Sequence, residues 1–211
     1  MRNLPAFARK RFAILAVLAF SAVPVSAEEK NFGKKLLEGA RVSITRAPVY
    51  DNRYVQIKYP LGDPGWQRGA CVDVIIRAFR HASGNTIDLQ KLVFEDIKRA
   101  PEAYGISALD SNIDHRRTRN LVIFFRRNAE VLPIDSKKDA ALLYRPGDIV
   151  VWDIMGNGKP NHIGIVSDKT NEDGVPFAIH HFREWRGFTG RPSEDDCLFL
   201  WPVLHHFRWR R

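Results

Sequence analysis

The sequence has few of the residues that cross-link small proteins or hold metal ions. Its 211 residues include only two cysteines, Cys71 and Cys197. Two cysteines exclude a disulfide-rich scaffold, and each thiol can be a packed side chain, half of a disulfide or a nucleophile. The compact ligand spacings of recognised zinc motifs are absent. A stretch that starts at Asp110 like a calcium loop lacks the glycine and the glutamate of an EF-hand, so we expect no metal and no cofactor.

Long hydrophobic runs are also absent, apart from a short one near the N-terminus. Residues 12–20 are apolar, follow a basic leader and precede the small residues 25–27. This is the plan of a secretory signal peptide, and the run is shorter than the roughly 20 apolar residues that span a bilayer. We predict a signal peptide over residues 1–27, cleaved after Ala27, and a periplasmic or secreted chain without stable membrane insertion. An uncleaved anchor is the alternative.

A strong excess of one charge is lacking as well. The formal net charge is +9, and removal of residues 1–27, with four basic and no acidic residues, lowers it to +5. Lys and Arg are scattered among Asp and Glu, which argues against a nucleic-acid-binding protein. A mild positive charge suits an exported protein that meets an anionic envelope polymer. No repeat or linker divides residues 28–211, which predicts a single domain, and we expect a monomer.

Helical periodicity is present in three segments of the chain. The first begins at Cys71 and ends near Gly84, a plausible C-cap residue. The second follows the cap residue Asp88, and the third follows Thr118 and covers residues 119–132.

Strand patterns dominate the rest of the chain. Residues 28–40 are a polar lead-in with some helical character, and residues 41–63 are predicted to be extended. Short β-branched segments separated by turn residues predict an antiparallel meander, with one or two last strands near the C-terminus. These segments are residues 148–154, 162–169, 177–182 and 197–209. Helices followed by strands predict an α+β domain whose helical half packs on a small antiparallel sheet.

Cys71 stands in the first turn of its predicted helix, directly after Arg68-Gly69-Ala70. Unpaired amides and the dipole at a helix start favour a negative charge, so we expect a lowered thiol pKa. The same amides can stabilise an oxyanion, and Gly69 permits a close backbone approach.

Two histidines are placed to assist this thiol. His162 opens one predicted strand and His180 ends the next, so an antiparallel pair would bring them together. A cysteine nucleophile needs a base, and the base needs an orienting partner. We predict these roles for Cys71, His162 and His180 respectively. His181 is the alternative orienter, although alternation sends its ring to the opposite face. Taken singly, each of these residues can equally be a buried thiol or a satisfied histidine.

These motifs resemble those of known cell-wall enzymes. The stretch "RGACVDVIIRAF…PGDIVVWD…HIGIVSD…IHH" resembles the papain-like NlpC-type endopeptidases and CHAP amidases. More closely, "YDNRYVQIKYPLGD", "DLQKLVFEDI" and "SNIDHRRTRNLVIFF" resemble an uncharacterised bacterial envelope family, domain of unknown function 1287, over about residues 40–208. The resemblance implies a papain-like fold with Cys71, His162 and His180 as catalytic residues. The helical stretch 85–145 is longer than in compact NlpC-type domains.

Other polar residues are candidates for substrate binding. Asp114, His115 and Arg116 are predicted to border the cleft, where arginine suits a substrate carboxylate, with helix capping as the alternative. Tyr50 is a candidate cleft residue, with aromatic packing as the alternative.

The expected function is an exported cysteine hydrolase that cuts amide bonds of peptidoglycan peptides or a related acyl substrate through a thioester. Two other classes stay open. One is a zinc site built from Cys71, His162 and His180, and the other is an envelope-binding module with a Cys71–Cys197 disulfide.

Overall fold

The computed structural model describes residues 27–46, 48–134, 139–185 and 187–210. The predicted signal peptide lies outside this range except for its last residue, Ala27. The helices are α1 (Ala27–Arg46), α2 (Cys71–Ser83), α3 (Leu89–Arg99), α4 (Pro101–Tyr104), α5 (Thr118–Asn128) and α6 (Ala140–Leu143), with a 3₁₀ turn, η1, at Asp114–Arg116. The strands are β1 (Val49–Tyr50), β2 (Arg68–Gly69), β3 (Glu130–Leu132), β4 (Ile149–Trp152), β5 (His162–Thr170), β6 (Pro176–His181), β7 (Pro192–Asp195) and β8 (Val203–Arg208). The protein is therefore of the α+β class, as predicted.

The main sheet is antiparallel, with the strand order β3-β8-β4-β5-β6-β7. The predicted meander is present from β4 to β7, whereas β8 returns to the other side of β4 and lies inside the sheet. Strands β1 and β2 form a separate short parallel pair that leads directly into α2. This pair fixes the chain just before Cys71.

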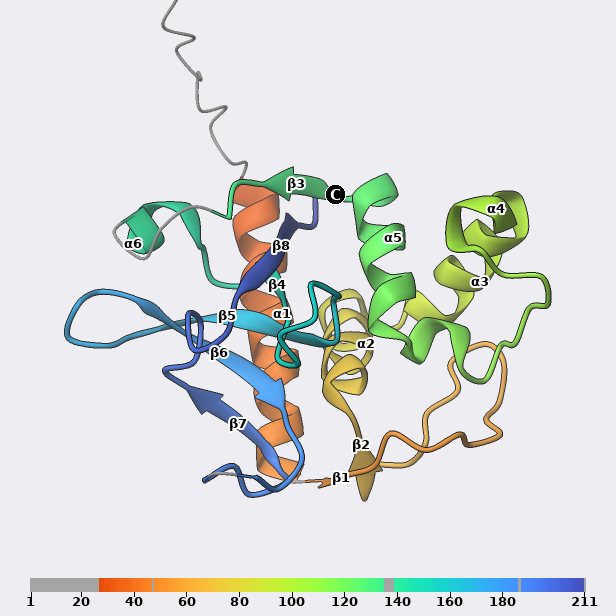
Figure 1. The fold of residues 1–211 in the computed structure, drawn as a ribbon, viewed down its shortest axis with the longest axis horizontal. Helices are drawn as coiled ribbons and strands as arrows, with labels where there is room; N and C mark the ends of the chain where they lie inside the picture. Colours follow the sequence, from red (N-terminus) through yellow and green to blue (C-terminus); the bar gives the residue numbers. More distant parts are fainter. Residues whose placement is uncertain (1–26, 47, 135–138, 186, 211) are drawn as a thin grey trace, which may run out of the picture.

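One face of the sheet is covered by α1 and α2, and α5 meets the edge of the sheet at β3 and β8, whereas α3 and α4 lie further from the sheet (Figure 1). The helix α2 buries Val74, Ile75 and Phe79 against Ile163 and Ile165 of β5 in one hydrophobic cluster. A second cluster, with Trp152, Val166 and Cys197, covers the opposite face. The sheet is thus packed on both faces, and the start of α2 meets the start of β5.

The two helices on the sheet approach each other closely at a glycine. A Cβ atom on Gly39 of α1 would lie 2.7 Å from Cβ of His81 and 2.9 Å from Cα of Ala78. Because real Cβ atoms essentially never come so near, only glycine allows this packing of α1 on α2.

Several element boundaries differ from those predicted. Residues 41–46 belong to α1 rather than to an extended segment, because Leu36, Leu37 and Ala40 continue a buried helical stripe to Ser43. The predicted third helix ends at Asn128, and β3 follows it as the partner of β8. Its expected cap, Thr118, is the first helical residue instead.

Other predicted helix ends are confirmed. Gly84 adopts the left-handed conformation, with φ of 58°, after the last turn of α2. The Asp88 carboxylate accepts a hydrogen bond from the Gln90 N–H at the start of α3. Among the described helices, none combines the length and the apolar character needed to cross a bilayer.

Candidate active site

Cys71 is the first residue of α2, and an acidic side chain holds the turn before it. The Asp73 carboxylate accepts a hydrogen bond from the Ala70 N–H at 2.6 Å. A Cβ on Gly69 would lie 3.0 Å from Nη1 of Arg77 and 3.3 Å from Cβ of Asp73. The absence of a side chain at Gly69 therefore lets the backbone pack tightly against the first turn of the helix.

The Cys71 thiol is buried at the start of β5. Its side chain is in hydrogen-bonding contact with the Ile163 N–H, the Thr118 hydroxyl and the Val72 N–H. Burial nevertheless raises the pKa of the thiol to about 11, and the negative charge of Asp73 acts in the same direction. The expected lowering of the thiol pKa is therefore wrong for the free protein, because desolvation outweighs the donors of the helix start.

His162 and His180 lie together, as the strand pairing predicts. Nε2 of His162 is 2.9 Å from Nδ1 of His180, and Nε2 of His180 is 3.1 Å from Oδ2 of Asp195. Both rings are buried among Trp152, Trp201 and other aromatic side chains. Burial, and then the neighbouring histidines, lower the pKa of His162 well below its ordinary value, so its ring is neutral at pH 7.

The two candidate orienting residues, His180 and His181, differ in their contacts. His181 points to the other side of the strand, where its ring lies edge-on to Tyr50 with the centroids 5.3 Å apart. Its Nε2 is 3.1 Å from the Gly190 carbonyl. His180, and not His181, therefore forms the hydrogen bond to His162.

Tyr50 lies near the thiol and lines an open pocket. Burial and the neighbouring Cys71 raise the pKa of the Tyr50 hydroxyl to about 12. The same residue lines a pocket of about 470 Å³ formed by residues 49–53 together with Gln67 and Arg68. Of the residues predicted to bind substrate, Tyr50 is the one that the structure places beside the thiol.

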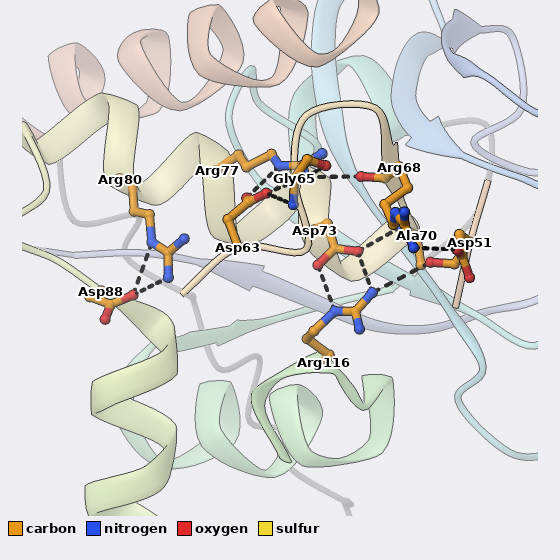
Figure 2. Close-up of polar contacts among 10 residues, drawn as sticks. All are labelled: Asp51, Asp63, Gly65, Arg68, Ala70, Asp73, Arg77, Arg80, Asp88 and Arg116. Atoms are coloured by element: carbon orange, nitrogen blue, oxygen red, sulfur yellow. Dashed lines mark hydrogen bonds and ion pairs between the residues drawn. The ribbon is translucent and has the colours of Figure 1, made fainter. Parts of the chain in front are cut away.

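Arg116 does not border a cleft as predicted. Its guanidinium donates to Asp73 at 2.8 and 2.9 Å and to the carbonyls of Arg53 and Asp51 at 3.2 and 3.4 Å. Both side chains of the Arg116–Asp73 pair are 2 % exposed. Figure 2 shows the guanidinium directed at the Asp73 carboxylate, whose Oδ2 accepts from both Arg116 and the Ala70 N–H. Four of the five N–H groups of Arg116 thus have partners inside the protein, and the guanidinium is committed to the carboxylate that holds the start of α2.

Asp114 and His115 are also internal parts of the fold. Asp114 accepts a hydrogen bond from the Asp110 N–H at 2.8 Å and is 4 % exposed. His115 is buried near the Arg80–Asp88 ion pair, and burial lowers its pKa to about 3. The Asp114 carboxylate caps no helix, so the capping alternative is wrong for it as well. Asp114 lines a pocket with residues 105–110 and Arg117, and none of Cys71, His162 and His180 lines that pocket.

The two alternatives for the cysteines and histidines lack support in the structure. Both thiols are free, and Cys71 and Cys197 belong to clusters on opposite faces of the sheet. His162 and His180 direct ring nitrogens at each other rather than at a shared ion. Within the described ranges, no three His, Cys, Asp or Glu side chains are arranged to hold a metal.

Asp195 and Ser193 were missed in the sequence. They lie on β7, where Ser193 is paired with His180, and the Ser193 hydroxyl donates to the carboxylate of Asp195. The segment Pro192–Asp195 has no strand-like alternation of apolar residues. Its only signal is an acidic side chain close in sequence to the strand that ends in two histidines.

Comparison with known proteins identifies the family but no activity. Residues 37–209 match the family described as Domain of unknown function (DUF1287), and the chain belongs to that family. It is 38 % identical over 185 residues to "Uncharacterized protein YijF" of Escherichia coli (strain K12), with 86 % of this chain and 83 % of that protein covered. No solved structure matches the chain significantly.

Proposed function

We propose that the protein is an exported cysteine hydrolase that cuts amide bonds of peptidoglycan peptides or of a related acyl substrate. Its fold would be of the papain-like kind found in NlpC-type endopeptidases and CHAP amidases. In those enzymes a cysteine starts a helix that packs on a small antiparallel sheet with the catalytic histidine at a strand start. The N-terminal apolar run supports export, and the resemblance to wall hydrolases supports the substrate class.

One observation carries the proposal. The Cys71 side chain contacts the backbone N–H of Ile163, the residue that directly follows His162. The thiol therefore lies at the strand start that holds the proposed base, which is itself hydrogen-bonded to a second histidine. Sequence-distant segments thus bring the thiol and the proposed base to the same strand start, which supports the proposal, since a cysteine nucleophile needs a base nearby.

The charges in the site define the order of proton transfers. The thiol is protonated and His162 is neutral at rest, so the nucleophile forms only as His162 removes the proton. Nε2 of His162 is engaged by His180, which leaves Nδ1 as the nitrogen for the thiol. General-base catalysis of this kind does not need a preformed thiolate.

The proposed reaction has two stages. Sγ of Cys71 attacks the carbonyl carbon, its proton passes to His162, and N–H groups near the start of α2 stabilise the oxyanion. His162 then protonates the amine as the carbon–nitrogen bond breaks, which leaves a thioester. A water molecule, deprotonated by His162, hydrolyses the thioester to a carboxylic acid and restores the thiol. Tyr50 and its pocket are the proposed place for the substrate next to the thiol.

The test uses purified peptidoglycan and the mature chain, residues 28–211. We expect new soluble fragments whose masses show one cleaved amide bond, and we expect their loss in Cys71→Ala and His162→Ala. Cys197→Ala is the matched control, because Cys197 is equally buried but lies on the opposite face of the sheet. Cleavage that persists in a folded Cys71→Ala variant would exclude the proposed chemistry.

A further inference from the structure

The hydrogen-bonded pair of His162 and His180 continues to the carboxylate of Asp195, which the sequence does not predict as part of the site. Nε2 of His162 meets Nδ1 of His180, and Nε2 of His180 meets Oδ2 of Asp195. Both imidazole rings are at most 1 % exposed, whereas the Asp195 side chain is 38 % exposed. The line of contacts therefore runs from the protein interior to a carboxylate at its surface.

Hydrogen-bond chemistry assigns the protons along this line. An ionised carboxylate only accepts hydrogen bonds, so Nε2 of His180 must carry the hydrogen that Asp195 receives. In a neutral ring, Nδ1 of His180 then has a lone pair and accepts from Nε2–H of His162. A neutral His162 with its hydrogen on Nε2 has a lone pair on Nδ1, the form that a general base needs.

We propose that Asp195 is a positioning residue that fixes the tautomers of His180 and His162 and so keeps Nδ1 of His162 free to accept a proton. Where it concerns proton transfer from Cys71, this inference rests on the proposed function. The tautomers themselves are a property of the folded chain and can be measured without any substrate.

The surroundings favour the ionised form of Asp195 and keep bulk water from hydrogen-bonding to the rings of His162 and His180. Burial alone would raise the pKa of Asp195, but hydrogen bonds from His180 and Ser193 outweigh it and hold the pKa below its ordinary value. Since the rings of His162 and His180 are buried, protein atoms rather than bulk water determine which nitrogen is protonated. The pairing of His180 with Ser193 across β6 and β7 holds the carboxylate at the end of the line.

The opposite assignment has a clear consequence. If His180 were doubly protonated, its Nδ1–H would donate to His162, and His162 would carry its hydrogen on Nδ1. That form could not accept the thiol proton. The arrangement of protons on His162 therefore distinguishes the two cases.

The first measurement is the ¹⁵N spectrum of histidine-labelled mature chain at neutral pH, with Asp195→Ala, Asp195→Glu and Asp196→Ala for comparison. We expect Nε2–H tautomers for His162 and His180, a second tautomer in Asp195→Ala, and partial return in Asp195→Glu. Asp196→Ala is the matched control, since Asp196 is exposed and accepts from Asn171 instead. A doubly protonated His180, or unchanged tautomers in a folded Asp195→Ala, would overturn the assignment.

Peptidoglycan cleavage by the same variants separates this inference from the proposed function. We expect kcat of Asp195→Ala to fall roughly 10- to 100-fold with little change in KM, as for other residues that orient a catalytic group. If the unmodified chain cleaves nothing while the tautomers respond to Asp195→Ala, the hydrolase proposal fails and the positioning role stands. If the unmodified chain and Asp195→Ala cleave peptidoglycan equally and the tautomers are unchanged, the positioning role fails and the hydrolase proposal stands.

Discussion

Replacing Arg116 by glutamine tests whether the cation holds the start of α2 or binds a substrate. The guanidinium and the Asp73 carboxylate are each 2 % exposed and share two hydrogen bonds of 2.8 and 2.9 Å. Removing one partner of such a pair leaves an uncompensated buried charge, which costs about 3 to 5 kcal/mol. Because domains are stable by about 5 to 15 kcal/mol, this loss is a large part of the total.

The assay is urea unfolding followed by tryptophan fluorescence and circular dichroism at pH 7. We expect Arg116→Gln to lower the free energy of unfolding by about 3 to 5 kcal/mol. The exposed Arg119→Gln control should stay within about 0.5 kcal/mol of the unmodified chain. The double variant Asp73→Asn with Arg116→Gln should recover part of the loss, since the unpaired carboxylate is gone.

The opposite result would refute this reasoning directly. If Arg116 bound a substrate carboxylate, its replacement would leave the unfolding free energy within about 1 kcal/mol and weaken substrate binding instead. Loss of stability in Arg116→Gln without recovery in the double variant would also contradict the pairwise account. In that case, the contacts of Arg116 with the carbonyls of Asp51 and Arg53 would carry the effect.

Three further predictions follow from burial. Alkylation of Cys71 in the folded chain should accelerate with pH up to about 10 without a plateau, since its pKa is about 11, and a plateau below pH 8.5 would contradict this. Burial lowers the pKa values of His115 and His181 to about 3 and about 4, so below pH 6.5 the unfolded chain takes up protons that the folded chain does not. Each of the two histidines should therefore lower the free energy of unfolding by about 2 kcal/mol between pH 6.5 and 5, measured by urea unfolding. His115→Gln should make the free energy of unfolding less dependent on pH in this range. Gly39→Val should cost about 1 to 3 kcal/mol by the same assay, because its Cβ would meet the α2 backbone; an equal loss in the exposed Glu38→Val would point to helix propensity instead.

The elements predicted correctly are those whose periodicity is set by the core. Helix α2 and strands β4 and β5 place a buried side chain at nearly every position that the pattern assigns inward. The end of α1 was misread because "RVSIT" is rich in β-branched residues, while its helical stripe depends on packing against α2 through Gly39. Strands β3 and β7 are short sheet edges with few apolar residues, so their pairing is set by tertiary contacts and not by local pattern.

The same distinction between local periodicity and tertiary contacts explains which residues of the candidate site could be predicted. Cys71, His162 and His180 stand at the starts and ends of periodic elements, and strand pairing then brings the two histidines together. Asp195 could not be found in this way, since its contact with His180 depends on the register of β6 and β7. Arg116 was misassigned because an arginine in a polar run indicates a surface, whereas its partner Asp73 lies far away in the sequence.

The protonation state of the Cys71 thiol depends on two opposing effects, the helix start and burial, whose magnitudes can be compared. A helix start favours a nearby negative charge by about 0.3 to 1 kcal/mol, and by up to about 2 kcal/mol when partly buried. The rise of the thiol pKa from 9.0 to about 11 corresponds to about 3 kcal/mol against the thiolate, after the helix-start donors have acted. Burial therefore outweighs the helix start, and the free protein holds a neutral thiol at Cys71 and a neutral imidazole at His162. In the proposed reaction, the proton must leave Cys71 as the bond to the substrate forms, which makes the lone pair on His162 the decisive feature of the proposal.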